Sequence, residues 1–242
     1  MKKTQNPLIL GILSLASLQI ATAGTYVSEG VYGNPFSAVS GAVATSIWSD
    51  VSDSVHTGFP GWPGSSSWGA TISPNSATGT STDIELERIA GTGHWFWVGG
   101  PYPADDTIYF GGFASSRNVG GTLAAEEVAP ISNLTEVIFQ IQLGEADGED
   151  FSSSAAPTLT YTTSSGTFTA TLTSGDATNP DDSFINGTYS NGEYDVDETV
   201  TLNEYEFTWD LSTVSETILS FKVEWNQAMH SQLYGFQVDQ KD

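Results

Sequence analysis

The stretch at residues 204–210 reads Glu-Tyr-Glu-Phe-Thr-Trp-Asp, so aromatic and polar residues alternate without a break. Successive side chains of a β-strand point to opposite faces, which places Tyr205, Phe207 and Trp209 on one face. One apolar and one polar face is typical of antiparallel sheets. The same pattern predicts further strands at 218–226 and 230–238, at 135–143, with Gln140 and Gln142 on the polar face, and at 167–173, with Phe168 on the apolar face. Another strand, through Leu159 and Tyr161, is predicted to pair with 167–173 through Ser164-Ser165-Gly166.

Helical periodicity is almost absent from the chain. The two short helical candidates lie at 123–128 and 210–215, and Pro130 limits the first of them. Asn186-Gly187 and Asn191-Gly192 are typical of tight hairpin turns. Many short strands with turn-rich connections predict an all-β fold, namely a single antiparallel β-sandwich with jelly-roll topology.

The N-terminus has the three parts of a secretory signal peptide. Met1-Lys2-Lys3 is basic, 8–20 is mainly apolar, and Ala21-Thr22-Ala23 supplies small residues for cleavage. The apolar run is shorter than the roughly 20 residues of a membrane span. We therefore expect a signal peptide at 1–23, cleavage near Ala23, and a secreted β-sandwich domain at 24–242 without a membrane span.

The composition excludes several classes of protein. The 242 residues include 29 Asp and Glu but 6 Lys and Arg, for a net charge of −23. A chain this acidic is a poor partner for nucleic acid, because phosphate binding needs clustered Lys and Arg. The chain has no Cys, which excludes a disulfide scaffold, a Cys-ligated zinc site and a thiol nucleophile.

The C-terminal end carries a family resemblance. Residues 220–225 read Ser-Phe-Lys-Val-Glu-Trp, and 230–240 read His-Ser-Gln-Leu-Tyr-Gly-Phe-Gln-Val-Asp-Gln. From Tyr205 to Gln240 the chain resembles exported β-sandwich proteins of the PEP-CTERM (exosortase-sorted) group. Those proteins continue into a Pro-Glu-Pro motif, an apolar helix and a basic tail, whereas this sequence stops at Asp242. The resemblance thus implies a bacterial protein that is released rather than anchored.

An alternating run of acids is the strongest indication of enzymatic chemistry. Asp83, Glu85 and Glu87 share one face of a predicted strand, with neighbouring acids about 6.6 Å apart along it. Paired carboxylates suit glycoside hydrolysis. The run resembles the Glu-x-Asp-x-Glu strand of the laminarinase/lichenase family, which implies Asp83 as nucleophile, Glu85 as supporting acid and Glu87 as acid/base. The first two acids are exchanged here and Arg88 follows, so a solvated strand face is the alternative interpretation.

Tryptophans are the candidates for carbohydrate binding. Trp62 and Trp68 lie in a Gly- and Pro-rich stretch, and Trp95 and Trp97 share one face of a predicted strand. Flat exposed rings stack on the apolar C–H faces of sugars, and ligand sites combine apolar walls with a few polar groups. The alternative for these rings is core packing. Three further tryptophans are assigned to the core, namely Trp48, Trp209 and Trp225.

Acidic loops are the candidates for a structural calcium ion. Calcium takes six to eight oxygen ligands, and flexible acidic loops supply them. The alternative is that these loops are simply solvated. The candidate ligands are Asp147, Glu149, Asp150, Asp181 and Asp182.

Three functions remain in competition. The first is a secreted, non-catalytic bacterial β-sandwich protein of the cell exterior, with a role in matrix or surface adhesion. The second is a carbohydrate-binding module that uses exposed Trp, with a polysaccharide as partner. The third is a glycoside hydrolase that uses the three acids.

Overall fold

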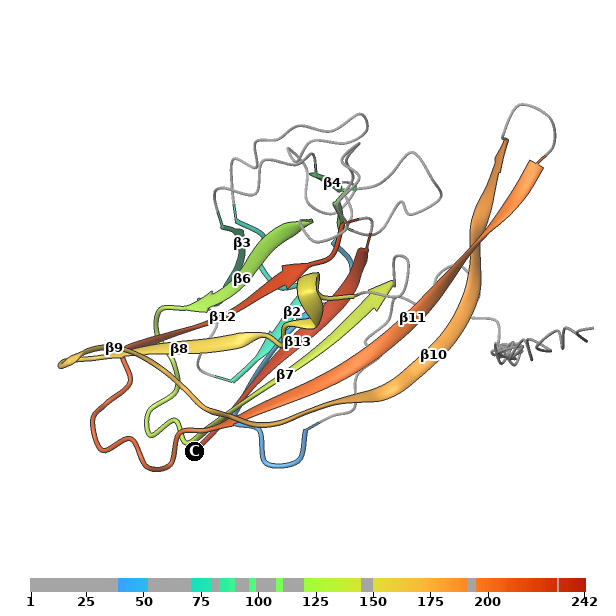
Figure 1. Cartoon of the computed structure of the whole chain (residues 1–242). Helices are drawn as coiled ribbons and strands as arrows, with labels where there is room; N and C mark the ends of the chain where they lie inside the picture. Colours follow the sequence, from blue (N-terminus) through green and yellow to red (C-terminus); the bar gives the residue numbers. More distant parts are fainter. Residues whose placement is uncertain are drawn as a thin grey trace, which may run out of the picture.

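The computed structural model describes the chain at 39–51, 71–79, 83–89, 96–98, 108–110, 120–144, 150–190, 195–229 and 231–242. The predicted signal peptide lies outside these residues. The described strands form two antiparallel sheets packed on each other (Figure 1). The predicted all-β antiparallel sandwich is thus confirmed, and its jelly-roll topology stays a prediction.

The larger sheet has eight described strands. β5 (Ile108–Phe110) pairs with β13 and with β4 (Phe96–Val98) beside the main path. Along that path the strands run in the order β10 (Leu172–Ser190), β11 (Asp195–Asp210), β7 (Glu136–Gly144), β13 (Gln232–Lys241), β1 (Ala44–Trp48) and β2 (Ser76–Thr78).

The smaller sheet has five described strands, and a short 3-10 helix, η1 (Ser152–Ser154), precedes one of them. In order across the sheet these strands are β3 (Glu85–Arg88), β6 (Gly121–Glu127), β12 (Ser220–Gln227), β8 (Thr158–Thr163) and β9 (Gly166–Thr169).

Aromatic rings from both sheets form the centre of the core. Phe139 and Phe236 come from the larger sheet and Trp225 from the smaller one, and all three are almost completely buried. The Phe139 ring centroid lies 5.2 Å from that of Trp225 and 5.9 Å from that of Phe236. Trp48 stacks on Phe236 at 4.2 Å. Trp209 is also buried, at 1% exposure. The prediction that Trp48, Trp209 and Trp225 belong to the core is therefore confirmed.

Most strands that the alternation predicts are present, but four local predictions are wrong. The helical candidate at 123–128 falls on strand β6, and 210–215 is a turn rather than a helix. Strand 167–173 is divided between β9 and β10, and β10 continues through Asn186-Gly187 with only a register shift where a turn was expected. The larger sheet is extended by this long β10–β11 hairpin (Figure 1).

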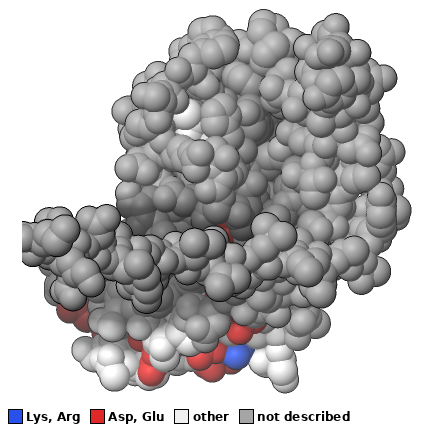
Figure 2. Space-filling view, turned by 45° about the vertical axis from the view of Figure 1, so that its right-hand side comes forward, with Lys and Arg blue, Asp and Glu red and all other residues white. Residues whose placement is uncertain are grey.

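The described part of the surface in Figure 2 is mainly acidic. Acidic side chains gather on the described part of the face in Figure 2, where basic side chains occupy a much smaller area. This agrees with the excess of Asp and Glu in the composition. Among the described residues there is no helix of the length and apolarity that a membrane span requires.

Candidate functional site

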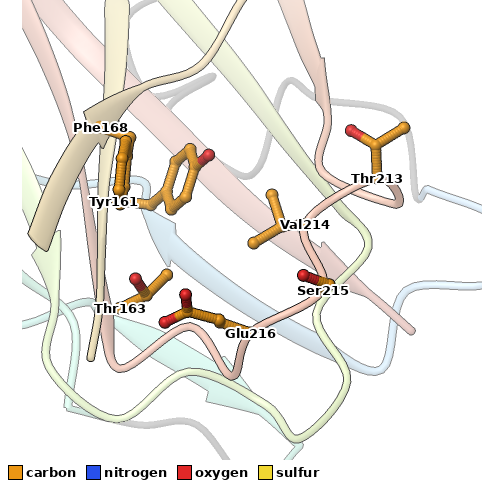
Figure 3. A pocket seen from close by; sticks show the side chains of 7 residues that line it. All are labelled: Tyr161, Thr163, Phe168, Thr213, Val214, Ser215 and Glu216. Carbon is orange, nitrogen blue, oxygen red and sulfur yellow. The ribbon is translucent and has the colours of Figure 1, made fainter. Parts of the chain in front are cut away.

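A pocket lies between the β8–β9 hairpin and the segment that follows β11 (Figure 3). Its volume is about 210 Å³. That is below the roughly 300–1,000 Å³ of sites for drug-sized ligands, so the pocket suits one small group or one unit of a polymer. Its walls are Tyr161, Thr163, Phe168, Thr213, Val214, Ser215 and Glu216.

Two stacked aromatic rings form one wall of the pocket. Tyr161 on β8 lies directly opposite Phe168 on β9, and their ring centroids are 5.6 Å apart with the planes inclined by 29°. Cross-strand neighbours stand about 5 Å apart, which brings the rings together. β9 is the edge strand of the smaller sheet, so Phe168 is 44% exposed. The pair thus presents an aromatic surface to solvent.

The opposite wall is the segment 211–219, which several backbone contacts hold in place. Leu211 is buried, and its N–H donates to the carbonyl oxygen of Thr135 at 2.7 Å. The Ser212 N–H donates to Oδ1 of Asp210 at 2.8 Å, which forms the turn where a helix was expected. The Leu219 N–H donates to the carbonyl oxygen of Thr162 on β8 at 2.8 Å, so one end of the segment is held by the residue that precedes β7 and the other by a strand.

Glu216 links this segment to the tip of the hairpin. Its Oε2 accepts a hydrogen bond from the Ser164 hydroxyl at 2.7 Å, and its Oε1 accepts one from the Ser165 hydroxyl at 2.6 Å. Gly166 completes the tip with a φ of +138°, a conformation that L side chains rarely adopt. The carboxylate therefore positions the wall of the pocket, and Figure 3 shows it beside Thr163.

The same hydrogen bonds lower the pKa of Glu216. Ser165 has the largest effect, followed by Ser164 and Thr163, and desolvation opposes them weakly. Hydrogen bonds to a carboxylate favour its charged form. The pKa of Glu216 is lower in the folded protein than in an unfolded chain. Its hydrogen bonds therefore stabilise the fold fully at a pH above the ordinary Glu pKa, and this stabilisation is lost as the pH falls through the pKa of the folded protein.

The lowered pKa of Glu216 can be measured directly. In a carboxyl NMR titration of the protein, the Glu216 midpoint is expected below the ordinary Glu pKa of about 4.3. In a Ser164→Ala, Ser165→Ala double variant the midpoint should rise toward the ordinary value, because the two main donors are gone. Equal midpoints in the two proteins would show that the serine contacts do not hold the carboxylate.

The tryptophans predicted to bind carbohydrate are not tested by the described residues. Trp62, Trp68 and Trp95 lie outside them. Trp97 lies on β4, where its backbone pairs opposite Tyr109 on β5. The aromatic residues that line the pocket are instead Tyr161 and Phe168, which were predicted on the apolar faces of two strands. The paired alternation around Ser164-Ser165-Gly166 predicts the hairpin, but not that its outer ring is exposed.

Two of the three acids of the predicted catalytic strand, Glu85 and Glu87, have ordinary structural partners. Glu85 and Glu87 lie on β3 with the buried Leu86 between them, whereas Asp83 precedes the strand and is exposed. The Glu85 carboxylate accepts a hydrogen bond from the Thr71 hydroxyl. Glu87 pairs with Lys222 at 2.7 Å.

Lys222 joins three strands of the smaller sheet through its charge. Besides Glu87 on β3, it contacts Glu126 on β6 at 3.0 Å. Desolvation tends to lower the pKa of Lys222, but hydrogen bonds and charges from these two acids outweigh it and raise the pKa. Glu87, the predicted acid/base, is thus part of an ion pair between two strands, which is a structural role.

The predicted calcium ligands that the structure describes do not lie together in exposed loops. Asp147 and Glu149 lie outside the described residues, and Asp181 and Asp182 fall within strand β10 rather than in a loop. Asp150 is buried, and its Oδ2 accepts hydrogen bonds from Asn203 Nδ2 at 2.8 Å and from the Tyr205 hydroxyl. No group of three or more His, Cys, Asp or Glu side chains converges within the described part of the chain.

Comparison with known proteins adds no relative. No protein-family model, curated protein or solved structure matched this chain.

Proposed function

We propose that this protein is an exported, non-catalytic β-sandwich of the cell exterior that adheres to polysaccharide through the pocket at Tyr161 and Phe168. The observation that carries the proposal is the stacked aromatic pair, whose outer ring is 44% exposed at the mouth of the pocket. Covering this ring with a ligand is favourable, because it removes apolar surface from water.

The polar groups around the rings match the chemistry of a sugar. The hydroxyls of Thr213 and Ser215, both on exposed residues, can each donate and accept hydrogen bonds. A pyranose ring presents C–H groups on its faces and hydroxyls around its edge. Such a ring can therefore stack on the aromatic pair while its edge contacts the hydroxyl side chains (Figure 3).

Export and a non-catalytic role have independent support. The basic start, apolar run and small residues at 1–23 are typical of a signal peptide. The resemblance to PEP-CTERM proteins favours a place outside the cell. The ion pair between Glu87 and Lys222 favours a structural role for the acids of β3. Binding without hydrolysis agrees with all three observations.

The decisive experiment is retention of the purified protein on a panel of insoluble polysaccharides. We expect the protein to be retained on at least one of them, with no soluble sugar released. Phe168→Ala should weaken binding to that polymer by at least about fivefold, because an aromatic contact of about 1 kcal/mol corresponds to that factor.

A matched control is available close to the pocket. Leu219 is 51% exposed and does not line the pocket, so Leu219→Ala removes a similar apolar surface without touching the site. This variant should bind as the unaltered protein does. Retention on none of the polymers, or equal losses in the two variants, would contradict the proposal.

A further inference from the structure

The face of the larger sheet that points away from the core carries a cluster of oxygen-bearing side chains. Cross-strand register aligns Glu206 on β11 with Gln140 on β7, and Gln140 with Gln237 on β13. The next row contains Asp239 opposite Thr45 on β1. These five residues, here called the outer oxygen cluster, alternate with core residues such as Phe139 and therefore share the opposite face.

The amide nitrogens of this cluster already have acceptors. Gln140 Nε2 donates to Glu206 Oε2 at 2.7 Å, and Gln237 Nε2 donates to Asp239 Oδ2 at 2.7 Å. The Thr45 hydroxyl donates to the other Asp239 oxygen at 2.5 Å. Each of the two amide nitrogens thus donates to a carboxylate, and the amide oxygen is the atom of each group that remains to be satisfied.

Those two amide oxygens have no hydrogen-bond partner among the described residues. Gln140 is 4% exposed and Gln237 only 1%, so bulk water does not satisfy them. Buried polar atoms in native proteins almost always have a partner, and each exception needs an explanation. Two neighbouring exceptions with the same chemistry indicate a shared partner that either donates hydrogen bonds or is a cation.

The charges around the cluster favour a cation. Asp239 is completely buried, and its carboxylate shares this face of the sheet with that of Glu206. The basic side chain closest to Asp239 along β13 is that of Lys241. Lys241 itself is paired with Glu136 at 2.7 Å. A positive ion between the carboxylates would relieve their repulsion and coordinate the free amide oxygens together.

We infer that the outer oxygen cluster is a calcium-binding site, with Gln140, Gln237, Glu206 and Asp239 as its protein ligands. Calcium takes carboxylate and amide oxygens in flexible numbers, whereas magnesium requires a near-ideal octahedron and gives up water reluctantly. Two carboxylates give a low ligand charge, which places the dissociation constant in the range of about 10⁻⁴–10⁻³ M found for extracellular modules. The site is separate from the pocket at Phe168.

Calorimetric titration of the purified protein with Ca²⁺ tests this assignment. We expect saturable binding in the stated range, together with an increase in Tm as calcium is added. Glu206→Gln should weaken binding at least about tenfold, because it removes one of the two charges. Glu224→Gln, which neutralises a carboxylate on β12 of the other sheet, should leave the dissociation constant unchanged.

A second variant distinguishes loss of calcium binding from loss of the fold, because it is expected to gain affinity. Gln140→Glu places a third carboxylate in the cluster, so its calcium-free Tm should fall while its affinity for Ca²⁺ rises at least about fivefold. A protein that merely holds a water molecule between the two amide oxygens would show no calcium dependence. That result, or equal calcium binding by the unaltered protein and both cluster variants, would overturn the assignment.

Discussion

Replacement of Phe139 by alanine is expected to lower the free energy of unfolding by about 3–5 kcal/mol, as is usual for large aromatic side chains in cores. Phe139 is completely buried and contacts the rings of Phe207, Trp225 and Phe236. These rings come from three other strands in both sheets, so none can easily move into the cavity. Urea unfolding followed by Trp fluorescence measures the effect.

Phe168→Ala provides the matched control, since it is the same chemical change at a ring that is 44% exposed. Its cost in unfolding free energy should be about 1 kcal/mol or less, because little buried area is lost. Similar costs for the two variants would contradict the packing at the centre of the sandwich.

The second large effect is expected at Asp150. Its alanine variant should lose about 2–4 kcal/mol of unfolding free energy, because two donors lose their charged acceptor and each such loss costs about 1–3 kcal/mol. Those donors are the amide of the buried Asn203 and the hydroxyl of Tyr205. Denaturant unfolding in a calcium chelator measures this loss apart from any effect of bound metal.

Asp150→Asn separates the hydrogen bonds from the size of the side chain. It keeps one carbonyl oxygen in place of the carboxylate, so it should cost less than half as much as Asp150→Ala. If the alanine variant is as stable as the unaltered protein, the contacts of Asp150 do not contribute to the fold.

Local patterns explain which elements could be predicted from the sequence. The alternation at 204–210 identifies the end of β11, and Ser164-Ser165-Gly166 identifies the β8–β9 hairpin, because strand period and turn chemistry act within a few residues. The segment 123–128 contains good helix formers, yet it is a strand. Its pairing with β3 and β12 outweighs the local preference, and that pairing is not visible locally.

For the candidate site residues too, the sequence predicts the face of the strand but not the exposure of the side chain. Alternation places Phe168 on the face that also carries core residues, but it does not reveal that β9 lies at the edge of its sheet, where this ring meets solvent. In the same way, Gln140 and Gln142 lie on the predicted polar face of their strand, and yet both are buried. A polar side chain on a strand is exposed only if nothing covers that face of the sheet.

The amino-acid sequence by itself determined the all-β class, most of the strands and the tryptophans of the core, since period-two alternation is a local property of each strand. Only the tertiary structure decided the order of the strands and their register. Register brings Gln140 beside Gln237 and Tyr161 beside Phe168. A shift of one residue would send every side chain of a strand to the other face, so the sites depend on how whole sheets assemble.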